Sequence, residues 1–396
     1  MSRRLLVLGF LIMASAAFGQ TTAVEYLEQG NERFNEADYA AAVANFSRAV
    51  ALDPGNTAAL RARGLAREKT KNYAGAIIDL TKVIEIGPKS GAAYYELGHA
   101  KMEMGDNSGA MADYTSAVSL DPGIAKAYYY RGIIRGTRLD SAGELADYAK
   151  AIESDPRFIE AYLSRGLIRR LQGDTDGAGS DFTAAINADP TSKSAYYERA
   201  SLFRALEMHE RAIADLTKLI ELDPADLGAY ESRGHERIDI KKYDGAIADF
   251  TVVLKSRSND AGILTSRAEA LKNIGDIDGA MTDLTRSINV GPKDASRLST
   301  LGELKYLKND HLGAIAAFAE ALALRPAGPE IYLRIGDLEY RNKDFKEAVA
   351  TFTQGIKIRY SDPLLYMRRA SAYRALNDNK NAIADEKAVK RLMNGN

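Results

Sequence analysis

The chain has 396 residues, of which 46% are hydrophobic and 27% are charged, and its formal net charge is −1. A polyanion binder normally carries a basic surplus, so this balance argues against nucleic acid as a partner. The absence of cysteine excludes disulfides, thiolate metal sites and cysteine catalysis, but it leaves the compartment open.

Residues 1–19 have the pattern of a secretory signal peptide. Arg3 and Arg4 precede an apolar run from Leu5 to Phe18, and the segment ends in small-x-small order at Gly19. Cleavage before Gln20 is expected, with the bacterial periplasm as the location and full secretion as the alternative. The run is too short for a membrane span, and an ordinary buried helix is the competing interpretation.

From Ala23 to Asn396 the sequence consists of eleven units of 34 residues, which leaves no room for a separate catalytic domain. The units start at Ala23, Thr57, Gly91, Ala125, Ile159, Lys193, Leu227, Ala261, Ala295, Pro329 and Pro363. Eight of the ten prolines lie on the same 34-residue grid, at residues 54, 88, 122, 156, 190, 224, 292 and 326. Apolar residues at helical spacing on both sides of an internal turn predict two helices per unit.

Three positions within the unit explain the pairing of these helices. The eighth residue is Gly or Ala throughout, and the twenty-fourth is aromatic or Leu in all units but the last, which has Glu386. Small residues facing large ones predict a close approach of the two helices. The sixteenth residue is Asp in eight units and is expected to cap the second helix. Glu386 and the acidic first helix of unit one predict terminal capping units.

This order of large, small and Pro positions resembles the tetratricopeptide repeat family. The resemblance implies an all-α fold, a right-handed α-solenoid of helix-turn-helix units whose first helices line a concave face. Two units depart from the pattern. Glu144 stands at the twentieth position of unit four, which is Ala in the other ten units, and in unit seven a polar segment at residues 255–260 replaces the Pro turn. Local irregularity is expected at both.

The seventh position carries Arg in seven units, and each of these units has Asp at the twenty-third position. These residues are Arg63, Arg131, Arg165, Arg199, Arg233, Arg267 and Arg369, with Asp79, Asp147, Asp181, Asp215, Asp249, Asp283 and Asp385. Structural pairing within a unit is the favoured interpretation, since an unpaired buried guanidinium is costly. A second basic row four residues later keeps open the alternative of an arginine ladder for acidic ligands.

No catalytic, cofactor or metal site is predicted. His209 and His311 stand where other units have Tyr or Phe at the interhelix turn, while His99 and His235 lie on first helices four units apart. Metalloprotease, phosphate-loop and nucleophile-elbow motifs are absent, and the family's carboxylate-clamp positions do not match. The sequence therefore predicts a protein that is not an enzyme.

The binding prediction falls on the concave face that the resemblance implies, at its most apolar run of open positions. The candidate residues are Tyr95, His99, Met102, Tyr129, Ile133, Leu163, Leu167 and Tyr197. Exposed aromatic surface in a groove is typical of peptide docking, although packing between first helices would explain the same residues. A weaker candidate comprises Tyr306, Leu333 and Tyr340, with Glu303 and Asp337 beside them.

These observations predict an exported scaffold that binds a protein or peptide and acts in envelope complex assembly. Self-association into a structural solenoid without a peptide ligand is the alternative. An enzyme hidden in the groove and an RNA-reading helical repeat are further competitors, which the missing catalytic constellation and the charge balance disfavour.

Overall fold

The computed structural model describes residues 22–324 and 329–394, and the predicted signal peptide lies outside these ranges. Within them the chain forms eleven pairs of α-helices and no β-strand, which confirms the all-α solenoid of helix-turn-helix units. The first helices are α2 (Ala23–Asn35), α4 (Thr57–Lys69), α6 (Gly91–Glu103), α8 (Ala125–Thr137), α10 (Ile159–Leu171), α12 (Lys193–Ala205), α14 (Leu227–Asp239), α16 (Ala261–Asn273), α18 (Ala295–Leu307), α20 (Pro329–Arg341) and α22 (Pro363–Ala375). The second helices are α3 (Tyr39–Leu52), α5 (Tyr73–Ile86), α7 (Asn107–Leu120), α9 (Ser141–Ser154), α11 (Thr175–Ala188), α13 (His209–Leu222), α15 (Tyr243–Ser256), α17 (Ile277–Val290), α19 (His311–Leu324), α21 (Phe345–Ile358) and α23 (Asn379–Asn394).

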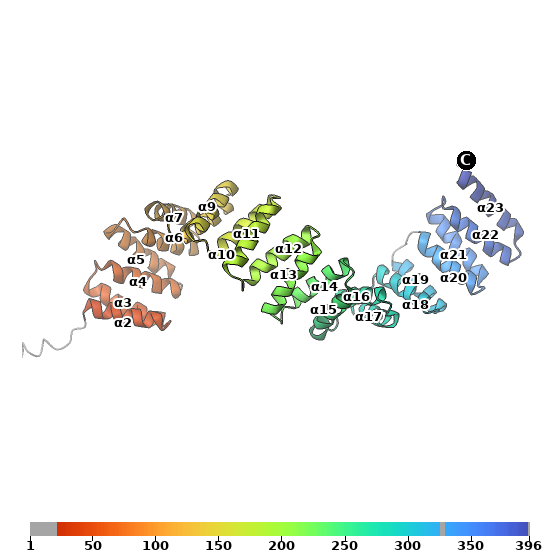
Figure 1. Ribbon diagram of the computed structural model, residues 1–396, viewed down its shortest axis with the longest axis horizontal. Coiled ribbons are helices and arrows are strands. Elements are labelled where there is room, and N and C mark those ends of the chain that lie inside the picture. The colour runs from red at the N-terminus through yellow and green to blue at the C-terminus, as the bar shows by residue number, and fades with distance from the viewer. Residues whose placement is uncertain (1–21, 325–328, 395–396) are drawn as a thin grey trace, which may run out of the picture. The chain divides into compact units, whose positions relative to one another are not determined.

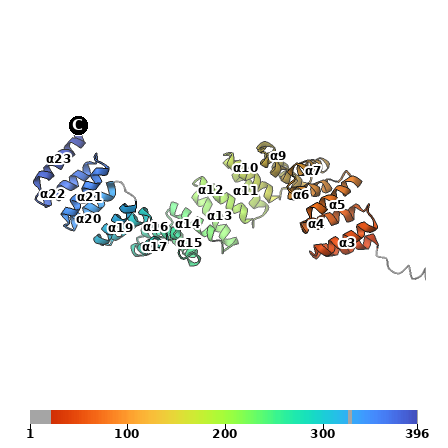
Figure 2. The same ribbon diagram turned by 180° about the vertical axis from the view of Figure 1, so that it is seen from behind.

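The described helices group into two compact bodies, which divide between Arg199 and Ala200. Within each body a helix packs on the helices next to it in the chain, so neighbouring pairs lie side by side (Figure 1 and Figure 2). No described helix is long and apolar enough to cross a membrane. Short-range packing of this kind is what makes a helical solenoid quasi-one-dimensional.

The two helices of a unit touch where the sequence places a small residue opposite a large one. A Cβ atom added to Gly166 would lie 2.6 Å from Cε1 of Phe182, and one added to Gly234 would lie 2.7 Å from Cε1 of Phe250. Both aromatic rings are fully buried. The glycines are therefore required by the close approach of the helices, as the sequence predicted.

The predicted caps of the second helices are present in seven of the eight units. The carboxylates of Asp38, Asp106, Asp140, Asp174, Asp276, Asp310 and Asp378 each accept a hydrogen bond from the backbone N–H three residues later. Asp344 is the exception, because its side chain makes no cap hydrogen bond. A side chain that accepts from these otherwise unpaired amides fixes the start of a helix.

The turn before each cap has one recurrent backbone feature. Its fifteenth residue has a positive φ, between 55° and 86°, in every unit. These residues are Ala37, Lys71, Gly105, Leu139, Gly173, Glu207, Lys241, Gly275, Asn309, Lys343 and Asn377. Only three of them are glycine, so eight units hold a side chain in a conformation that favours glycine.

The expected irregularities in units four and seven are wrong. Helices α8 and α9 have the same 13 and 14 residues as other pairs, because Gly136 leaves room for the buried Glu144 carboxylate and Tyr148 donates a hydrogen bond to it at 3.0 Å. In unit seven, the Asp260 carboxylate accepts from the amides of Gly262 and Ile263 and caps α16. Glu144 is thus accommodated by specific polar contacts, and the junction after unit seven keeps the same kind of cap that Asn56, Asp226 and Asp294 provide elsewhere.

Candidate functional site

The predicted site in units three to six contains a cluster of aromatic rings, which we call the aromatic cluster. Its members are Tyr95, His99, Tyr114, Tyr129, Tyr130, Tyr148 and Phe158, from α6 to α9 and the turn before α10. Ring centroids are 5.4 Å apart for His99 and Tyr130 and 5.0 Å apart for Tyr129 and Phe158. Edge-to-face contacts at these distances stabilise the packing of neighbouring helices.

The predicted residues differ in how much surface they offer. Tyr95, Met102, Tyr129 and Ile133 are half-buried, and the first two pack against the core formed by Tyr114 and Ile134. Leu163 and Leu167 on α10 are also half-buried. Tyr197 is the exposed member of the set, with 59% of its surface accessible. The aromatic residues of α6 and α8 therefore pack against one another, whereas the Tyr197 side chain is exposed to solvent.

An acid–base pair lies at the edge of the aromatic cluster. His99 Nδ1 is 3.7 Å from Oε1 of Glu68 on α4, and this carboxylate oxygen is buried without a hydrogen-bond partner. The interaction with Glu68 raises the pKa of His99, against the opposing effect of burial. Burial, with the nearby Tyr130 and Glu68, raises the pKa of Tyr95, so its hydroxyl stays neutral.

The weaker candidate corresponds to a cavity in the C-terminal body, which we call the α18–α20 pocket. Its volume is about 350 Å³, and it is lined by Glu303, Tyr306, Leu307, Phe318, Arg334, Asp337, Leu338 and Arg341. Three predicted residues, Glu303, Tyr306 and Asp337, lie in its wall. Leu333 and Tyr340 do not line it, because Leu333 packs beside the Phe352 cluster and Tyr340 lies on Phe345 with ring centroids 5.2 Å apart.

The α18–α20 pocket has an apolar floor and a charged rim. Glu303 is paired with Arg334 and with Lys272, whose Nζ lies 3.2 Å away. Burial opposes the ionisation of Glu303, but the hydrogen bonds from Arg334 and Lys272 outweigh it and lower its pKa. Both carboxylates of the rim thus have cationic partners, since Asp337 lies 3.2 Å from Arg368 Nε.

Arg341 is the rim cation that differs from the others. Its Nη1 donates to the Tyr306 hydroxyl at 2.5 Å, and its guanidinium carbon lies 5.8 Å from the centre of the Tyr306 ring. Its charge acts on Asp337, opposing the effect of burial on the pKa of that carboxyl, but among the described residues no carboxylate forms an ion pair with Arg341 within 4.0 Å. Five lining residues were not predicted from the sequence: Leu307, Phe318, Arg334, Leu338 and Arg341. The thirteenth position of the unit, which the resemblance marks as open, carries both Leu307 and Arg341 and was the available signal.

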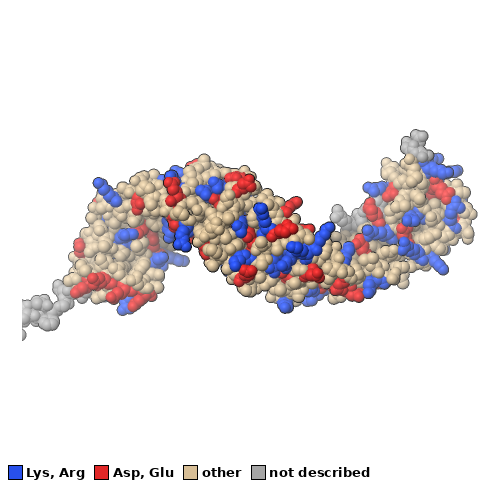
Figure 3. Space-filling model, in the orientation of Figure 1, with Lys and Arg blue, Asp and Glu red and all other residues tan. Residues whose placement is uncertain are grey.

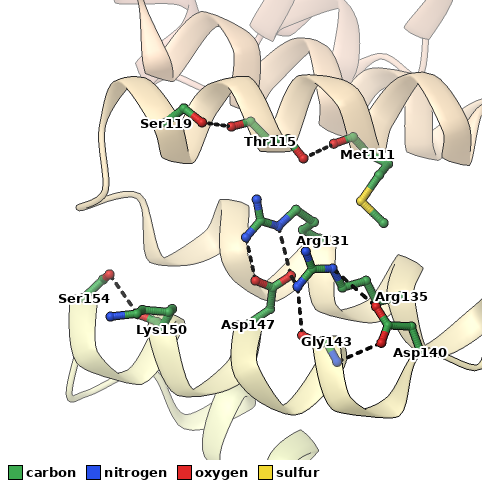
Figure 4. A network of polar contacts seen from close by, with 10 residues as sticks. All are labelled: Met111, Thr115, Ser119, Arg131, Arg135, Asp140, Gly143, Asp147, Lys150 and Ser154. Atoms are coloured by element: carbon green, nitrogen blue, oxygen red, sulfur yellow. Dashed lines mark hydrogen bonds and ion pairs between the residues drawn. The ribbon is translucent and has the colours of Figure 1, made fainter.

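The arginines of both rows bind carboxylates of their own unit. Arg131 holds both oxygens of Asp147 at 2.7 and 2.9 Å, and Arg135 of the second row binds the same carboxylate at 3.0 Å (Figure 4). The same bidentate geometry joins Arg63 to Asp79, Arg165 to Asp181, Arg233 to Asp249, Arg267 to Asp283 and Arg369 to Asp385. These contacts confirm the within-unit pairing. The buried carboxylate that both rows share also removes the repulsion between them.

The arginines of the seventh position also connect consecutive units. Nη1 of Arg199, Arg233, Arg267 and Arg369 donates to the hydroxyl of Thr183, Thr217, Thr251 and Thr353, respectively, in the preceding unit. One guanidinium therefore binds a carboxylate in its own unit and a hydroxyl in the neighbouring one. This leaves few donors for an external ligand.

Models of the tetratricopeptide repeat match residues 27–91, 300–363 and 333–395, and a second model of that description matches residues 91–124 and 194–226. The chain belongs to the tetratricopeptide repeat family. No curated protein matches its sequence.

Among solved structures, the chain is similar to the protein MamA, with 27% identity over 41% of this chain and 94% of that one, at a TM-score of 0.38. It is also similar to a tetratricopeptide repeat protein from Parabacteroides merdae, with 21% identity, 64% and 100% coverage and a TM-score of 0.44. A third structure is YrrB, described as a tetratricopeptide repeat protein with an unusual peptide-binding site, with 20% identity, 46% and 95% coverage and a TM-score of 0.39.

Proposed function

We propose that this tetratricopeptide repeat protein is an exported, non-enzymatic scaffold that binds a segment of another protein on its first helices. The observation that carries the proposal is the α18–α20 pocket, a cavity of about 350 Å³ beside two first helices. Concave sites with an apolar floor and a few polar groups are typical of ligand binding. Export to the bacterial periplasm, and a role in assembling an envelope complex, rest on the sequence pattern of residues 1–19.

The chemistry of the α18–α20 pocket specifies the bound segment. Leu307, Phe318 and Leu338 provide an apolar floor that suits one large aliphatic or aromatic side chain. Glu303 and Asp337 already have cationic partners, whereas Arg341 has donors left for a carboxylate. The ligand is therefore a peptide segment with a large apolar residue next to Asp or Glu.

Selection from a library of random displayed peptides tests this assignment. The wild-type chain should enrich peptides with an apolar–acidic pair. Arg341→Gln should keep the apolar preference and lose the acidic one, whereas Tyr340→Ala, outside the pocket, should select as the wild type does. Failure to enrich any sequence, or identical selection by Arg341→Gln, contradicts the assignment.

The predicted residues of units three to six are proposed as a separate contact surface of the N-terminal body. Because Tyr95 and Tyr129 pack inside the aromatic cluster, changing them would disturb the fold and the surface together. Tyr197→Asp is the sharper variant, since this side chain is mostly exposed. A ligand that binds this surface should bind Tyr197→Asp more weakly, and equal binding of every selected ligand would remove these residues from the site.

Self-association is the second candidate function, and one observation favours it. The last two helices expose the apolar side chains of Leu364, Met367, Ile383 and Met393. Light scattering on the chain from Gln20 onward distinguishes the two functions. A concentration-dependent oligomer that Met367→Ser and Ile383→Ser together abolish would support the structural solenoid, and a monomer at all concentrations would exclude it.

A further inference from the structure

A buried carboxylate breaks the internal repeat at unit seven. Glu236 has only 4% of its surface accessible. The tenth position of the other units carries Glu32, Ala66, Ala100, Ile134, Ile168, Leu202, Ala270, Leu304, Leu338 and Ala372. Of these, the one other acid, Glu32, is exposed on the first helix of the chain. Burying a charged carboxylate costs free energy unless other groups pair with it, so the groups around Glu236 must compensate for this cost.

The partners of Glu236 come from the preceding unit. Arg204 Nε donates to Oε1 at 2.8 Å, and His209 Nδ1 lies 2.8 Å from Oε2. Asp239, one turn further along α14, places Oδ2 3.9 Å from the same His209 nitrogen. One nitrogen and two carboxylate oxygens, on three residues, thus lie within 4.8 Å of one another.

We propose that His209 Nδ1, Glu236 Oε2 and Asp239 Oδ2 bind one divalent transition-metal ion of the zinc class. Imidazole and carboxylate ligands suit this class, and protein zinc sites have metal–nitrogen and metal–oxygen distances of about 2.0 to 2.2 Å. Ligand atoms around a tetrahedral ion at such distances are roughly 3.3 Å apart. The two distances of 2.8 and 3.9 Å from His209 bracket this value, so small side-chain rotations create the site.

The surroundings supply what a metal centre needs beyond its ligands. Arg204 binds the Glu236 oxygen that the metal does not use, and such outer contacts orient ligating carboxylates. Glu207 adds a third negative charge near His209, which together with Glu236 and Asp239 outweighs Arg204. The Asp239 side chain is 53% accessible, so water can complete the coordination from the solvent side.

The chain contains its own control for this site. His311 occupies in unit nine the position that His209 occupies in unit six. Its Nδ1 lies 3.3 Å from the amide oxygen of Asn342, and the positions equivalent to Glu236 and Asp239 carry Leu338 and Arg341. A histidine in the same place on the repeat without the two acids cannot form the proposed ligand set.

The experiment is a titration of the untagged chain with Zn²⁺ by calorimetry, and with Co²⁺ by visible absorption. We expect one equivalent to bind with micromolar affinity and Co²⁺ to give the absorption bands of a low-coordinate nitrogen–oxygen site. His209→Ala should weaken binding at least 10-fold, and Asp239→Asn, a surface change that leaves the Glu236 contacts intact, should also weaken it. His311→Ala should bind as the wild type does.

The proposal is overturned if the wild type binds no Zn²⁺ at millimolar concentration, since the cluster is then only an ion pair. It is equally overturned if His209→Ala and Asp239→Asn, both folded by circular dichroism, bind as tightly as the wild type. Loss of binding in His311→Ala would place the ion elsewhere. Because the readout is the metal itself, these outcomes are independent of peptide binding at the α18–α20 pocket.

Discussion

At the scale of single residues, the paired guanidinium and carboxylate within a unit are the contacts whose loss is most costly. Arg267 binds both oxygens of the buried Asp283 and no second-row arginine shares this acid. Asp283→Ala leaves the guanidinium half-buried and unpaired, so the free energy of unfolding should fall by about 3 to 5 kcal/mol. Urea denaturation monitored by circular dichroism measures the change.

The matched control removes both partners. Unit nine carries Leu301 and Ala317 where unit eight has Arg267 and Asp283. Arg267→Leu with Asp283→Ala copies this arrangement and should destabilise less than Asp283→Ala alone, because no buried charge is left unpaired. An equal or greater loss in the double variant would show that the pair is worth more than its apolar replacement.

The close approach of the two helices gives a second residue-scale prediction. A Cβ on Gly234 would overlap Phe250, whose ring is held on another side by His235 at a centroid distance of 5.1 Å. Gly234→Ala should therefore lower the free energy of unfolding by about 1 to 3 kcal/mol. Unit eight combines Ala268 with Leu284, so adding Phe250→Leu to Gly234→Ala should recover part of the loss. No recovery would contradict the steric explanation.

The pair of His99 and Glu68 predicts how stability depends on pH. The carboxylate raises the folded-state pKa of His99 above its ordinary value of 6.5. A protonated His99 therefore adds stability that is fully present below pH 6.5 and is lost as the pH rises through the folded pKa. The difference in melting temperature between the wild type and His99→Gln should therefore be smaller at about pH 8 than at about pH 6. A constant difference would contradict the pairing.

At the scale of the helix pair, the interhelix turn holds unfavourable backbone in most units. Leu139 has φ 62° and is 91% accessible, so it has a strained conformation and an exposed apolar side chain. Leu139→Gly should raise the free energy of unfolding by about 1 kcal/mol, because glycine adopts this conformation without the steric cost. Thermal melting measures the gain.

The reverse change at the same position of another unit is its control. Gly173 has φ 83° with open space around its Cβ position, so Gly173→Leu changes the backbone preference without creating an overlap. It should destabilise by about the amount that Leu139→Gly stabilises. The two substitutions should change the free energy of unfolding in opposite directions, and stabilisation by both would exclude backbone strain as the cause.

The sequence predicts the helix pairs well and the turns less well. Gly opposite Phe, as at Gly166 and Phe182, and Asp before a second helix are local patterns with one physical explanation each. The left-handed turn residue was not predicted, because eight units have another residue, such as Leu139, at the position where a recurrent glycine would have indicated a positive φ. The expected irregularity at Glu144 was wrong because the compensating Gly136 lies on the other helix of the pair.

The lining of the α18–α20 pocket, the proposed binding surface, was predictable only in part for a similar reason. Open positions of the repeat identify Tyr306, Glu303 and Asp337, but the floor of the α18–α20 pocket comes from Phe318 on a second helix. Whether Tyr129 is free or packed depends on Phe158 in the turn before the next unit. The sequence pattern of one helix does not contain that information.

At the scale of the whole molecule, surface charge is mixed. On the face seen in Figure 3, basic and acidic side chains alternate, with acidic ones gathered over α2, where Glu25, Glu28 and Glu32 are exposed. This agrees with the near-zero net charge of the chain. The proposed peptide recognition therefore rests on local groups such as Arg341 rather than on the electrostatic field of the whole protein.

Each unit packs only on the units next to it, so the removal of a terminal unit should expose the core of its neighbour. Leu365 and Ala372 of α22 complete a core with Phe352 and Ile356 of α21. A chain that stops at residue 362 should expose this core, bind a hydrophobic dye more strongly and lose solubility. The control is a full-length chain with Leu364→Ser, which alters surface but not this core. A truncated chain as soluble as the wild type would contradict the expectation.

The hydrogen bonds from seventh-position arginines to threonines of the preceding unit give four of the described junctions the same donor and acceptor. A gene with such internal copies can gain or lose whole units by unequal recombination, and the new junction finds the same donor and acceptor. The junction of units six and seven has this bond and a further contact of its own, because His209 lies on one side and Glu236 and Asp239 lie on the other. Recombination that joins unit six to any other unit would leave His209 without its acids, so selection for that cluster would fix these two units in their order, whereas the other three junctions with an Arg–Thr bond would tolerate exchange.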